Sequence, residues 1–266
     1  MGKISDLIKG FATSGEKRFN SAVVLASGSG KRFGDDRAKQ FVLLDGIPVF
    51  IRSLMAFEKS KETDEIVLVT READIAGCRN LASEYGITKL TRVVAGGDTR
   101  QDSARLGFEA VNPECDFVAI HDAARCLVTS EMIDKTFTEA YIVGAAACAA
   151  RATDTMKKSD YAGNITETID RDNVWNVQTP QIFMAEMYRA AAYTAKKDFV
   201  LATDDCMLCE RLGFKVRLVD CGKTNMKITY PEDIAVAKAI LEYRNANKSR
   251  EDRKSTRLNS SHHSIS

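Results

Sequence analysis

Short runs of apolar, β-prone residues alternate with segments of helical periodicity along most of the chain, and this alternation constrains the fold more than any other feature. It predicts an α/β domain in which a mostly parallel sheet carries helices on both faces. The strand candidates are residues 22–26, 65–70, 91–95, 117–121, 145–149 and 215–220. The helix candidates are residues 49–59, 72–85, 100–111, 130–141, 185–197, 204–212 and 231–243.

Residues 151–174 interrupt this alternation. The segment is polar, and its turn signal at Ala162-Gly163-Asn164 lies between two short β-prone stretches. We expect a two-stranded β-arm that protrudes from the sheet. Because an isolated hairpin is only marginally stable in water, the arm should pack on another surface, and a homodimer formed through it would supply one. A mobile surface loop is the alternative.

The remaining segments fall into one domain with an extension at each end. Residues 20–250 suit a single domain, since a chain of 266 residues can bury one sizeable core. Residues 1–19 precede the first strand, and we expect them to form a short surface helix. Residues 251–266 look foreign, because the stretch from Asp252 to His262 resembles the translation of a common sequencing adapter. Resequencing the 3′ end of the gene from an independent clone tests this expectation.

Composition narrows the class of protein. A formal net charge of +1, with 28% charged residues, argues against a nucleic-acid partner recognised by bulk charge. No apolar run is long enough to cross a membrane, and residues 1–19 lack the apolar core of a secretory signal. Seven cysteines without a regular spacing indicate reduced thiols in a cytoplasmic protein. Cys206 and Cys209 have C-x-x-C spacing, but no second ligand pair is near, so zinc is not expected.

The connection after the first strand candidate is rich in glycine and basic residues. Gly28 and Gly30 would let backbone N–H groups approach phosphate oxygens, and Lys31, Arg32 and Lys39 would supply positive charge. The Walker pattern fails because its first glycine and its Ser or Thr after the lysine are both missing, and the dinucleotide pattern fails at its third glycine. A tight turn without any ligand uses the same residue types, so this loop alone does not establish a phosphate-binding site.

Polar residues at the ends of later strand candidates favour a ligand site. Asp98 and Ser103 follow the third candidate, and Asp122 and Arg125 follow the fourth. Carboxylates at such positions commonly hold Mg²⁺ beside a triphosphate, which makes Asp122 a candidate metal ligand. His121 should point to the opposite face by strand alternation, as a core histidine. No Ser-His-Asp or Cys-His arrangement stands out, so the pattern favours phosphoryl-type chemistry without a covalent intermediate.

These motifs, in this order, resemble the 2-C-methyl-D-erythritol 4-phosphate cytidylyltransferase family of isoprenoid biosynthesis over residues 21–243. The motifs are the glycine-rich loop with AKQF, then AGGDTRQDS, HDAAR, DTMK, TIDR, QTPQ, TDD, and NMKIT with PED. The resemblance implies a Rossmann-like nucleotidyltransferase domain and the transfer of CMP from CTP to a sugar-alcohol phosphate, with Mg²⁺ or another divalent cation.

The resemblance also assigns roles to individual residues. Those implied to stabilise the triphosphate and the reacting α-phosphate are Arg32, Lys39 and Lys227. Those implied to bind CTP are Ala26, Ser27, Gly28, Gly30, Gly97, Asp98 and Ser103. Those implied to bind the acceptor are Asp122, Arg125, Thr155, Arg171 and Thr203, with Thr155 and Arg171 acting from the arm across a dimer.

The sequence departs from the family pattern at three positions. Ala38 replaces a proline before Lys39, Ser27 replaces a smaller residue, and Cys126 replaces a proline after HDAAR. None of these changes removes a charged group, so we expect activity. Two alternatives stay open. One is a ribitol-5-phosphate cytidylyltransferase that makes CDP-ribitol, and the other is a nucleotide-binding regulator that has lost catalysis.

Overall fold

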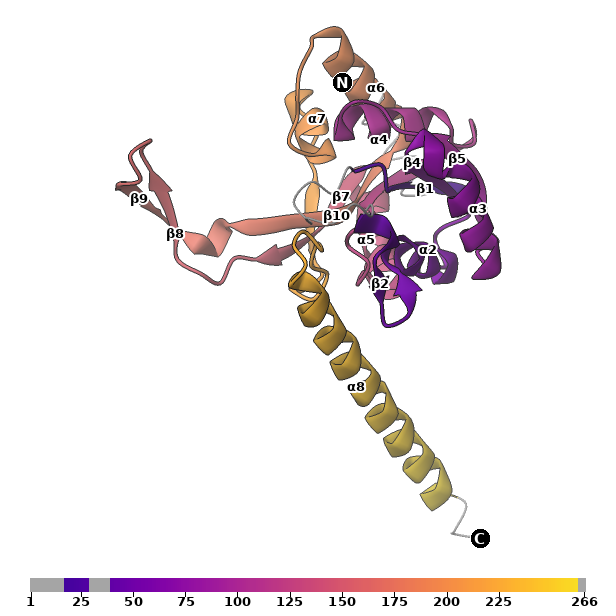
Figure 1. The fold of residues 1–266 in the computed structure, drawn as a ribbon. Helices are drawn as coiled ribbons and strands as arrows, with labels where there is room; N and C mark the ends of the chain where they lie inside the picture. Colours follow the sequence, from indigo (N-terminus) through magenta and orange to yellow (C-terminus); the bar gives the residue numbers. More distant parts are fainter. Residues whose placement is uncertain (1–16, 29–38, 263–266) are drawn as a thin grey trace.

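A single seven-stranded sheet forms the centre of the computed structural model, which describes residues 17–28 and 39–262 (Figure 1). The strand order is β11-β7-β10-β6-β1-β4-β5. All pairings are parallel except those of β10, which runs antiparallel to both β6 and β7. The strands are β1 (Asn20–Leu25), β4 (Glu65–Thr70), β5 (Leu90–Ala95), β6 (Phe117–Asp122), β7 (Ala145–Arg151), β10 (Trp175–Met184) and β11 (Arg217–Asp220).

The predicted parallel α/β architecture is confirmed, and each of the six strand candidates corresponds to a strand of the sheet. Strand β10 was not predicted. It contains Pro180, and a proline inside a candidate strand argues against a central position. The structure accommodates Pro180 where the pairing between β10 and β7 shifts register, between Val177 and Gln181.

Helices cover both faces of the sheet, as the alternation predicted. On one face α2 and α5 pack together with α3 beside them, and on the other face lie α4, α6 and α7 (Figure 1). The helices are α2 (Val49–Lys59), α3 (Ile75–Glu84), α4 (Arg100–Glu109), α5 (Ser130–Val143), α6 (Ala185–Lys197), α7 (Asp205–Arg211) and α8 (Asp233–His262). Short elements are η1 (Lys39–Phe41), η2 (Glu72–Asp74), η3 (Arg171–Asn173), β2 (Leu43–Leu44) and β3 (Ile47–Pro48).

The core lies between the sheet and these two helical layers. All six residues of β1, of β4 and of β6 are buried, as expected for parallel strands covered on both sides. Helix α4 approaches the sheet closely at Gly107, where a Cβ would collide with Val23 of β1 and Val69 of β4. This close approach fixes the start of α4 above the ends of those strands.

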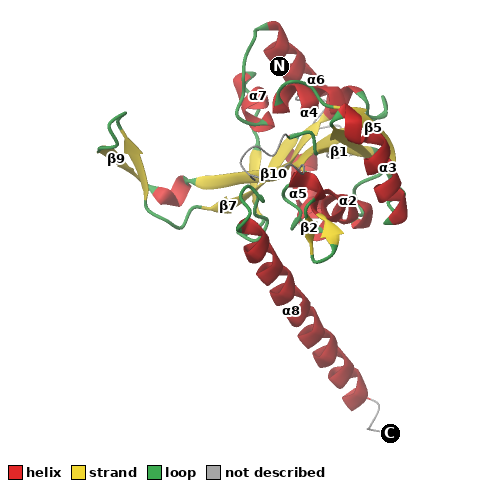
Figure 2. Ribbon diagram, in the orientation of Figure 1, coloured by secondary structure: helices red, strands yellow, loops and turns green. Residues whose placement is uncertain are grey.

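The predicted β-arm is present, formed by β8 (Met156–Ser159) and β9 (Ile165–Ile169). The two strands pair only with each other, and they lie at the end of an extension that continues from β7 and β10 (Figure 2). Gly163 turns the chain between them with a φ of +86°, a conformation that glycine adopts without strain. The arm therefore stands well away from the central sheet.

Helix α8 leaves the domain in another direction and continues to His262, beyond the predicted end at residue 243 (Figure 1). Its backbone includes most of residues 251–266, and the non-native origin of that segment stays a prediction. The expected helix in residues 1–19 falls mostly outside the described residues. None of the helices that the structure describes is long and apolar enough to cross a membrane.

Candidate active site

Several of the predicted site residues lie where parallel strands end, at the carboxyl edge of the sheet. Asp122 is the last residue of β6 and pairs in register with Leu25, the last residue of β1. The loops that follow β1 and β5 begin at the same edge. Ligands of open α/β sheets bind at this edge because successive loops converge there.

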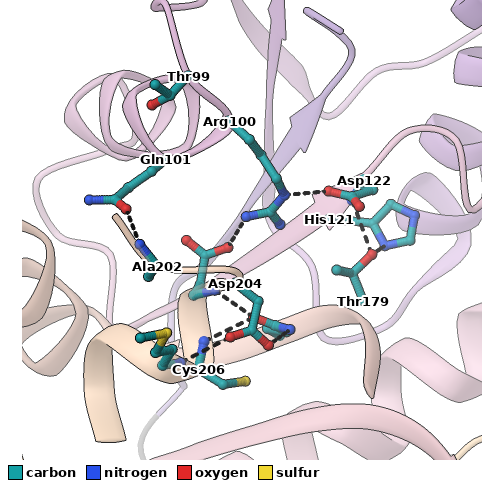
Figure 3. A network of polar contacts seen from close by, with 12 residues as sticks. Thr99, Arg100, Gln101, His121, Asp122, Thr179, Ala202, Asp204 and Cys206 are labelled. Carbon is teal, nitrogen blue, oxygen red and sulfur yellow. Dashed lines mark hydrogen bonds and ion pairs between the residues drawn. The ribbon is translucent and has the colours of Figure 1, made fainter. Parts of the chain in front are cut away.

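Asp122 binds two cations, and one of them reaches a second carboxylate. Arg100 Nε donates to Asp122 Oδ1 at 2.9 Å (Figure 3). Lys227 Nζ lies 2.6 Å from Asp122 Oδ2. Arg100 Nη1 also donates to Asp205 Oδ2 at 2.7 Å. The four side chains come from the start of α4, the end of β6, the start of α7 and the loop after β11. We call them the Arg100 cluster.

The Arg100 cluster keeps Asp122 ionised. Burial alone would raise the pKa of this carboxyl, but the positive charges of Arg100 and Lys227 outweigh it and hold the pKa well below its usual range. The two carboxylates in turn raise the pKa of Arg100 against the opposing effect of its burial. Two negative and two positive side chains make the cluster formally neutral.

His121 lies on the opposite face of β6, as the strand alternation predicted. Its ring packs edge-on against Phe57 of α2, and its Nδ1 lies 3.0 Å from Thr179 Oγ1. Burial lowers its pKa to about 3, so the imidazole is neutral at physiological pH. Thr179 Oγ1 also accepts a hydrogen bond from the backbone N–H of Asp122 at 3.0 Å. His121 therefore helps to hold the end of β6 through Thr179, on the face opposite the Asp122 side chain.

Two serine hydroxyls connect the loops after β1 and β5. Ser27 Oγ lies 3.0 Å from Ser103 Oγ, and Ser103 Oγ accepts from the backbone N–H of Gly97 at 3.1 Å. Gly96 leaves room for this contact, because a Cβ there would lie 2.7 Å from Ser103 Oγ. Backbone groups of both loops are thereby held close together beside the N-terminus of α4, where an anion is favoured.

The loop that carries Lys227 is held by a buried asparagine. Asn225 Nδ2 donates to Gln178 Oε1 at 3.0 Å and to the carbonyl of Thr179 at 2.8 Å. Arg125 Nη1 donates to the carbonyl of Asn225 at 2.9 Å, so the HDAAR loop also contacts this segment. Lys227 is therefore fixed at its base by the strand that carries Thr179.

The structure brings several predicted site residues together and leaves others apart. Asp122 and Lys227 are in contact, as are Ser27 and Ser103. Ala26 donates its backbone N–H to Val69 and is buried, which leaves its carbonyl as the backbone group available for a ligand.

Other predicted residues are exposed at the rim of the site or lie outside the part of the chain that can be described. Gly28, Asp98 and Thr203 are exposed, and Thr203 lies just before α7. Gly30 and Arg32 lie outside the described residues. For Lys39, the first residue of η1, the structure describes only the backbone.

The arm residues Thr155 and Arg171 are far from the sheet edge in a single chain. Thr155 immediately precedes β8, Arg171 begins η3 after β9, and the arm projects away from the domain (Figure 1). Arg171 Nη1 donates to the carbonyl of Thr153 at 2.9 Å, which holds the base of the arm. Both side chains are exposed.

Sequence reasoning missed the partners that hold the site residues in place. Arg100, Asp205, Thr179 and Asn225 fall within the motifs AGGDTRQDS, TDD, QTPQ and NMKIT, but no role was assigned to them. Their contacts join positions such as Arg100 and Asp205, 105 residues apart, and no local pattern encodes such a pairing. The sequence signal that could have indicated these partners was the recurrence of polar residues at strand and helix ends.

The donor set can be compared with the needs of Mg²⁺. Among the residues that the structure describes, no group of three or more His, Cys, Asp or Glu side chains could hold a metal ion. Mg²⁺ bound to nucleotides usually keeps several waters and takes only one or two protein carboxylates. Asp122 fits that role as a single ligand, provided that one of its two cations releases an oxygen.

The fold and the site define a class of protein. A parallel sheet that presents glycines, paired hydroxyls and a carboxylate–lysine pair at its carboxyl edge is typical of α/β enzymes that act on nucleoside phosphates. Residues 21–243 match the family model of 2-C-methyl-D-erythritol 4-phosphate cytidylyltransferase. The chain belongs to this family.

Individual relatives agree with the family match. A 2-C-methyl-D-erythritol 4-phosphate cytidylyltransferase from Syntrophus aciditrophicus is 39% identical over 222 residues, which cover 83% of this chain and 95% of the relative. One from Clostridium botulinum is 38% identical and covers 84% and 97%. The crystal structure of 4-diphosphocytidyl-2C-methyl-D-erythritol synthase from Anaerococcus prevotii has a TM-score of 0.77 at 32% identity and covers 85% and 97%.

Proposed function

We propose that this protein transfers CMP from CTP to 2-C-methyl-D-erythritol 4-phosphate and releases pyrophosphate. The Lys227–Asp122 pair at the end of β6 is the observation that carries the proposal, because it supplies a cation at the edge where nucleotide and acceptor would meet. Family membership supports the choice of both substrates.

The reaction requires alignment of the two substrates more than it requires a general base. An oxygen of the acceptor phosphate attacks the α-phosphorus of CTP, and the bond from that phosphorus to the bridging oxygen breaks, so that pyrophosphate leaves with the electron pair. The attacking phosphate is already an anion at neutral pH. The barrier therefore lies in repulsion between two anions, and cations placed around the α-phosphate reduce it.

The residues divide into two halves of one site. We assign the backbone and hydroxyl groups of Ala26, Ser27, Gly97 and Ser103, with Asp98, to the cytosine and ribose. The glycine-rich loop with Gly28, Gly30, Arg32 and Lys39 would hold the triphosphate, and Lys227 would reach the α-phosphate. Removing one such charge typically costs a few kcal/mol, or ~10²–10³ in rate.

Asp122 would hold a Mg²⁺ ion by exchanging it for Lys227, which is the more exposed of its two cations. When bound, the ion would neutralise charge on the triphosphate. We expect turnover to stop with EDTA and to return with added Mg²⁺.

We further propose that the acceptor half is completed by a second subunit. Asp122, Arg125 and Thr203 would contact the acceptor from one chain, while Thr155 and Arg171 would reach it from the partner's arm. Two observations support this. Thr155 and Arg171 are exposed and stand away from their own sheet edge, and the arm exposes the apolar side chains of Tyr161 and Ile165.

Mixing two defective variants, at an acceptor concentration well below the raised KM of Arg171→Ala, tests the shared site. In a homodimer of Lys39→Ala every CTP half is defective, and in one of Arg171→Ala every arm is defective. If the arm acts across the dimer, a mixed dimer contains one intact site, so mixing the variants restores activity. Failure of the mixture to recover activity, with mixed dimers verified by mass, would refute the shared site.

The acceptor assay tests the function itself. Purified protein is given CTP, Mg²⁺ and either 2-C-methyl-D-erythritol 4-phosphate or ribitol 5-phosphate, and pyrophosphate release is measured. We expect the first acceptor to have the higher kcat/KM, and a preference of about ten-fold or more for ribitol 5-phosphate would overturn the assignment. CTP binding without turnover on either acceptor would favour the regulator.

Two arm variants separate acceptor binding from a general effect on the arm. Arg171→Ala should raise the KM for the acceptor. Lys158→Ala is the matched control, because Lys158 pairs with Glu167 on the exposed arm surface at 2.6 Å and has no proposed role. An unchanged acceptor KM in Arg171→Ala would remove the arm from the site.

We also propose a cytoplasmic location. The described cysteines are free thiols, which suits a reducing compartment. Cell fractionation with an antibody against the chain checks this.

A further inference from the structure

Arg100 has no role in the reaction as proposed so far, although it contacts both carboxylates of the Arg100 cluster. We propose that Arg100 is a positioning residue, which holds Asp122 in place so that Lys227 is free to leave Asp122 and bind a substrate phosphate. This inference rests on the proposed cytidylyl transfer.

The contacts of Arg100 suit a fixed anchor. Its Nε and Nη1 bind two different carboxylates, Asp122 at 2.9 Å and Asp205 at 2.7 Å. The side chain of Asp205 is only 1% exposed, and its other oxygen accepts from Tyr188 OH at 2.8 Å. Arg100 is also the first residue of α4, whose start is capped by Thr99. The backbone of Arg100 is thereby held by the helix start, and its guanidinium group by the two carboxylates.

Lys227 differs from Arg100 mainly in how it is held. Arg100 binds two carboxylates and is 32% exposed, whereas Lys227 binds Asp122 alone among the two carboxylates of the cluster and is 40% exposed. Lys227 is therefore the cation that can turn toward an incoming phosphate. When it does so, a largely buried carboxylate lacks that partner until Mg²⁺ would take its place, and an uncompensated buried charge is costly. Arg100 keeps Asp122 paired, which reduces that cost.

The position of Arg100 also joins the two halves of the proposed site. It follows Gly97 and Asp98 of the nucleotide half in the same loop, and through Asp205 it holds the start of α7, two residues beyond Thr203 of the acceptor half. Small displacements of reacting groups lower rates strongly, by about 10²-fold for about 1 Å. Loss of Arg100 should therefore lower kcat more than it weakens CTP binding.

The test removes the charge pair without leaving a buried carboxylate alone. Arg100→Gln by itself would leave Asp205 without a cation, so reduced folding could explain any loss of activity. The double variant Arg100→Gln with Asp205→Asn avoids this, because an amide at position 205 can still accept from Tyr188. We expect the double variant to have a melting temperature near that of the wild type, a Kd for CTP within about three-fold of it, and a kcat about 10²-fold lower.

Two further variants sharpen the result. Arg100→Lys keeps the charge but cannot span both carboxylates as the planar guanidinium does, so it should recover only part of kcat. Arg105→Gln is the matched control, because Arg105 lies on the same helix and pairs with Glu109 at 2.6 Å, outside the cluster. Its kcat should equal that of the wild type.

Each other outcome has a definite meaning. A double variant with wild-type kcat would show that Arg100 acts only on folding, and the proposal would be wrong. Loss of CTP binding as large as the loss of kcat would place Arg100 in the nucleotide site itself and would also overturn it. Absence of turnover in the wild type, with CTP still bound, would instead refute the proposed reaction. The role proposed for Arg100 depends on that reaction and would be refuted as well.

Discussion

The contact between the loops after β1 and β5 can be tested with a single methyl group. In Gly96→Ala, the new Cβ would lie 2.7 Å from Ser103 Oγ and 2.7 Å from Ser27 Cβ. Ordinary contacts begin near 3.4 Å, so each neighbour must move by about 0.7 Å to restore one. That movement breaks the hydrogen bond between the two hydroxyls and the one from the Gly97 N–H.

The expected effect on CTP follows from these two hydrogen bonds. Each hydrogen bond contributes about 1 kcal/mol to holding the two loops in the arrangement that binds CTP. Loss of both should therefore weaken CTP binding by about 2 kcal/mol, or about 30-fold. The strain should also lower the free energy of unfolding by about 1–3 kcal/mol. Calorimetry measures the Kd for CTP, and urea unfolding measures the stability.

A second glycine supplies the control for Gly96→Ala. Gly77 lies on the exposed side of α3, and a Cβ there would meet no atom within 4 Å. Gly77→Ala should stabilise the protein by about 0.5–1 kcal/mol, through the higher helix propensity of alanine, and leave the Kd for CTP unchanged. If folded Gly96→Ala protein binds CTP within two-fold of the wild type, the serine contact does not organise the nucleotide site, and the reasoning is refuted.

Three further predictions concern stability and redox chemistry. Burial lowers the pKa of His121 to about 3, whereas in the unfolded chain this histidine titrates near pH 6.5. As the pH falls from about 6.5 toward about 3, the unfolded chain binds a proton that the folded chain does not, so the free energy of unfolding falls by up to about 1.4 kcal/mol per pH unit. The free energy of unfolding of His121→Asn, measured at about pH 6.5 and about pH 5.5, should depend less on pH than that of the wild type. Gly107→Ala should destabilise the protein by about 1–3 kcal/mol, because the clash with Val23 exceeds the gain in helix propensity, and urea unfolding measures the change. Cys148 and Cys221 have Sγ atoms 2.9 Å apart, and the hydrogen bond between these thiols lowers the pKa of Cys221 to about 7. Glutathione disulfide should therefore join these two thiols before the other cysteines, as peptide mass mapping would reveal.

Much of the local structure could be predicted from the sequence. The helix candidates at residues 49–59 and 185–197 coincide with α2 and α6, and the alternation of β6 placed His121 and Asp122 on opposite faces. These predictions succeed because periodicity reports which side of an element is buried, and burial on one face is a local property of the sequence. The motifs at strand ends also indicated the edge of the sheet at which the candidate site lies, because the loops that follow parallel strands converge at one edge.

The tertiary structure alone decided which distant residues meet. Strand β10 enters the sheet antiparallel between β6 and β7, and it brings Thr179 to the backbone of Asp122. The pairing of Arg100 with Asp205 likewise depends on how the start of α7 and the segment before it contact the start of α4. No periodic pattern encodes contacts between residues 57 or 105 positions apart, since their partners are chosen by packing and charge compensation in the folded core. The sequence by itself determined the elements and the types of group at their ends, and packing determined which carboxylate holds which cation.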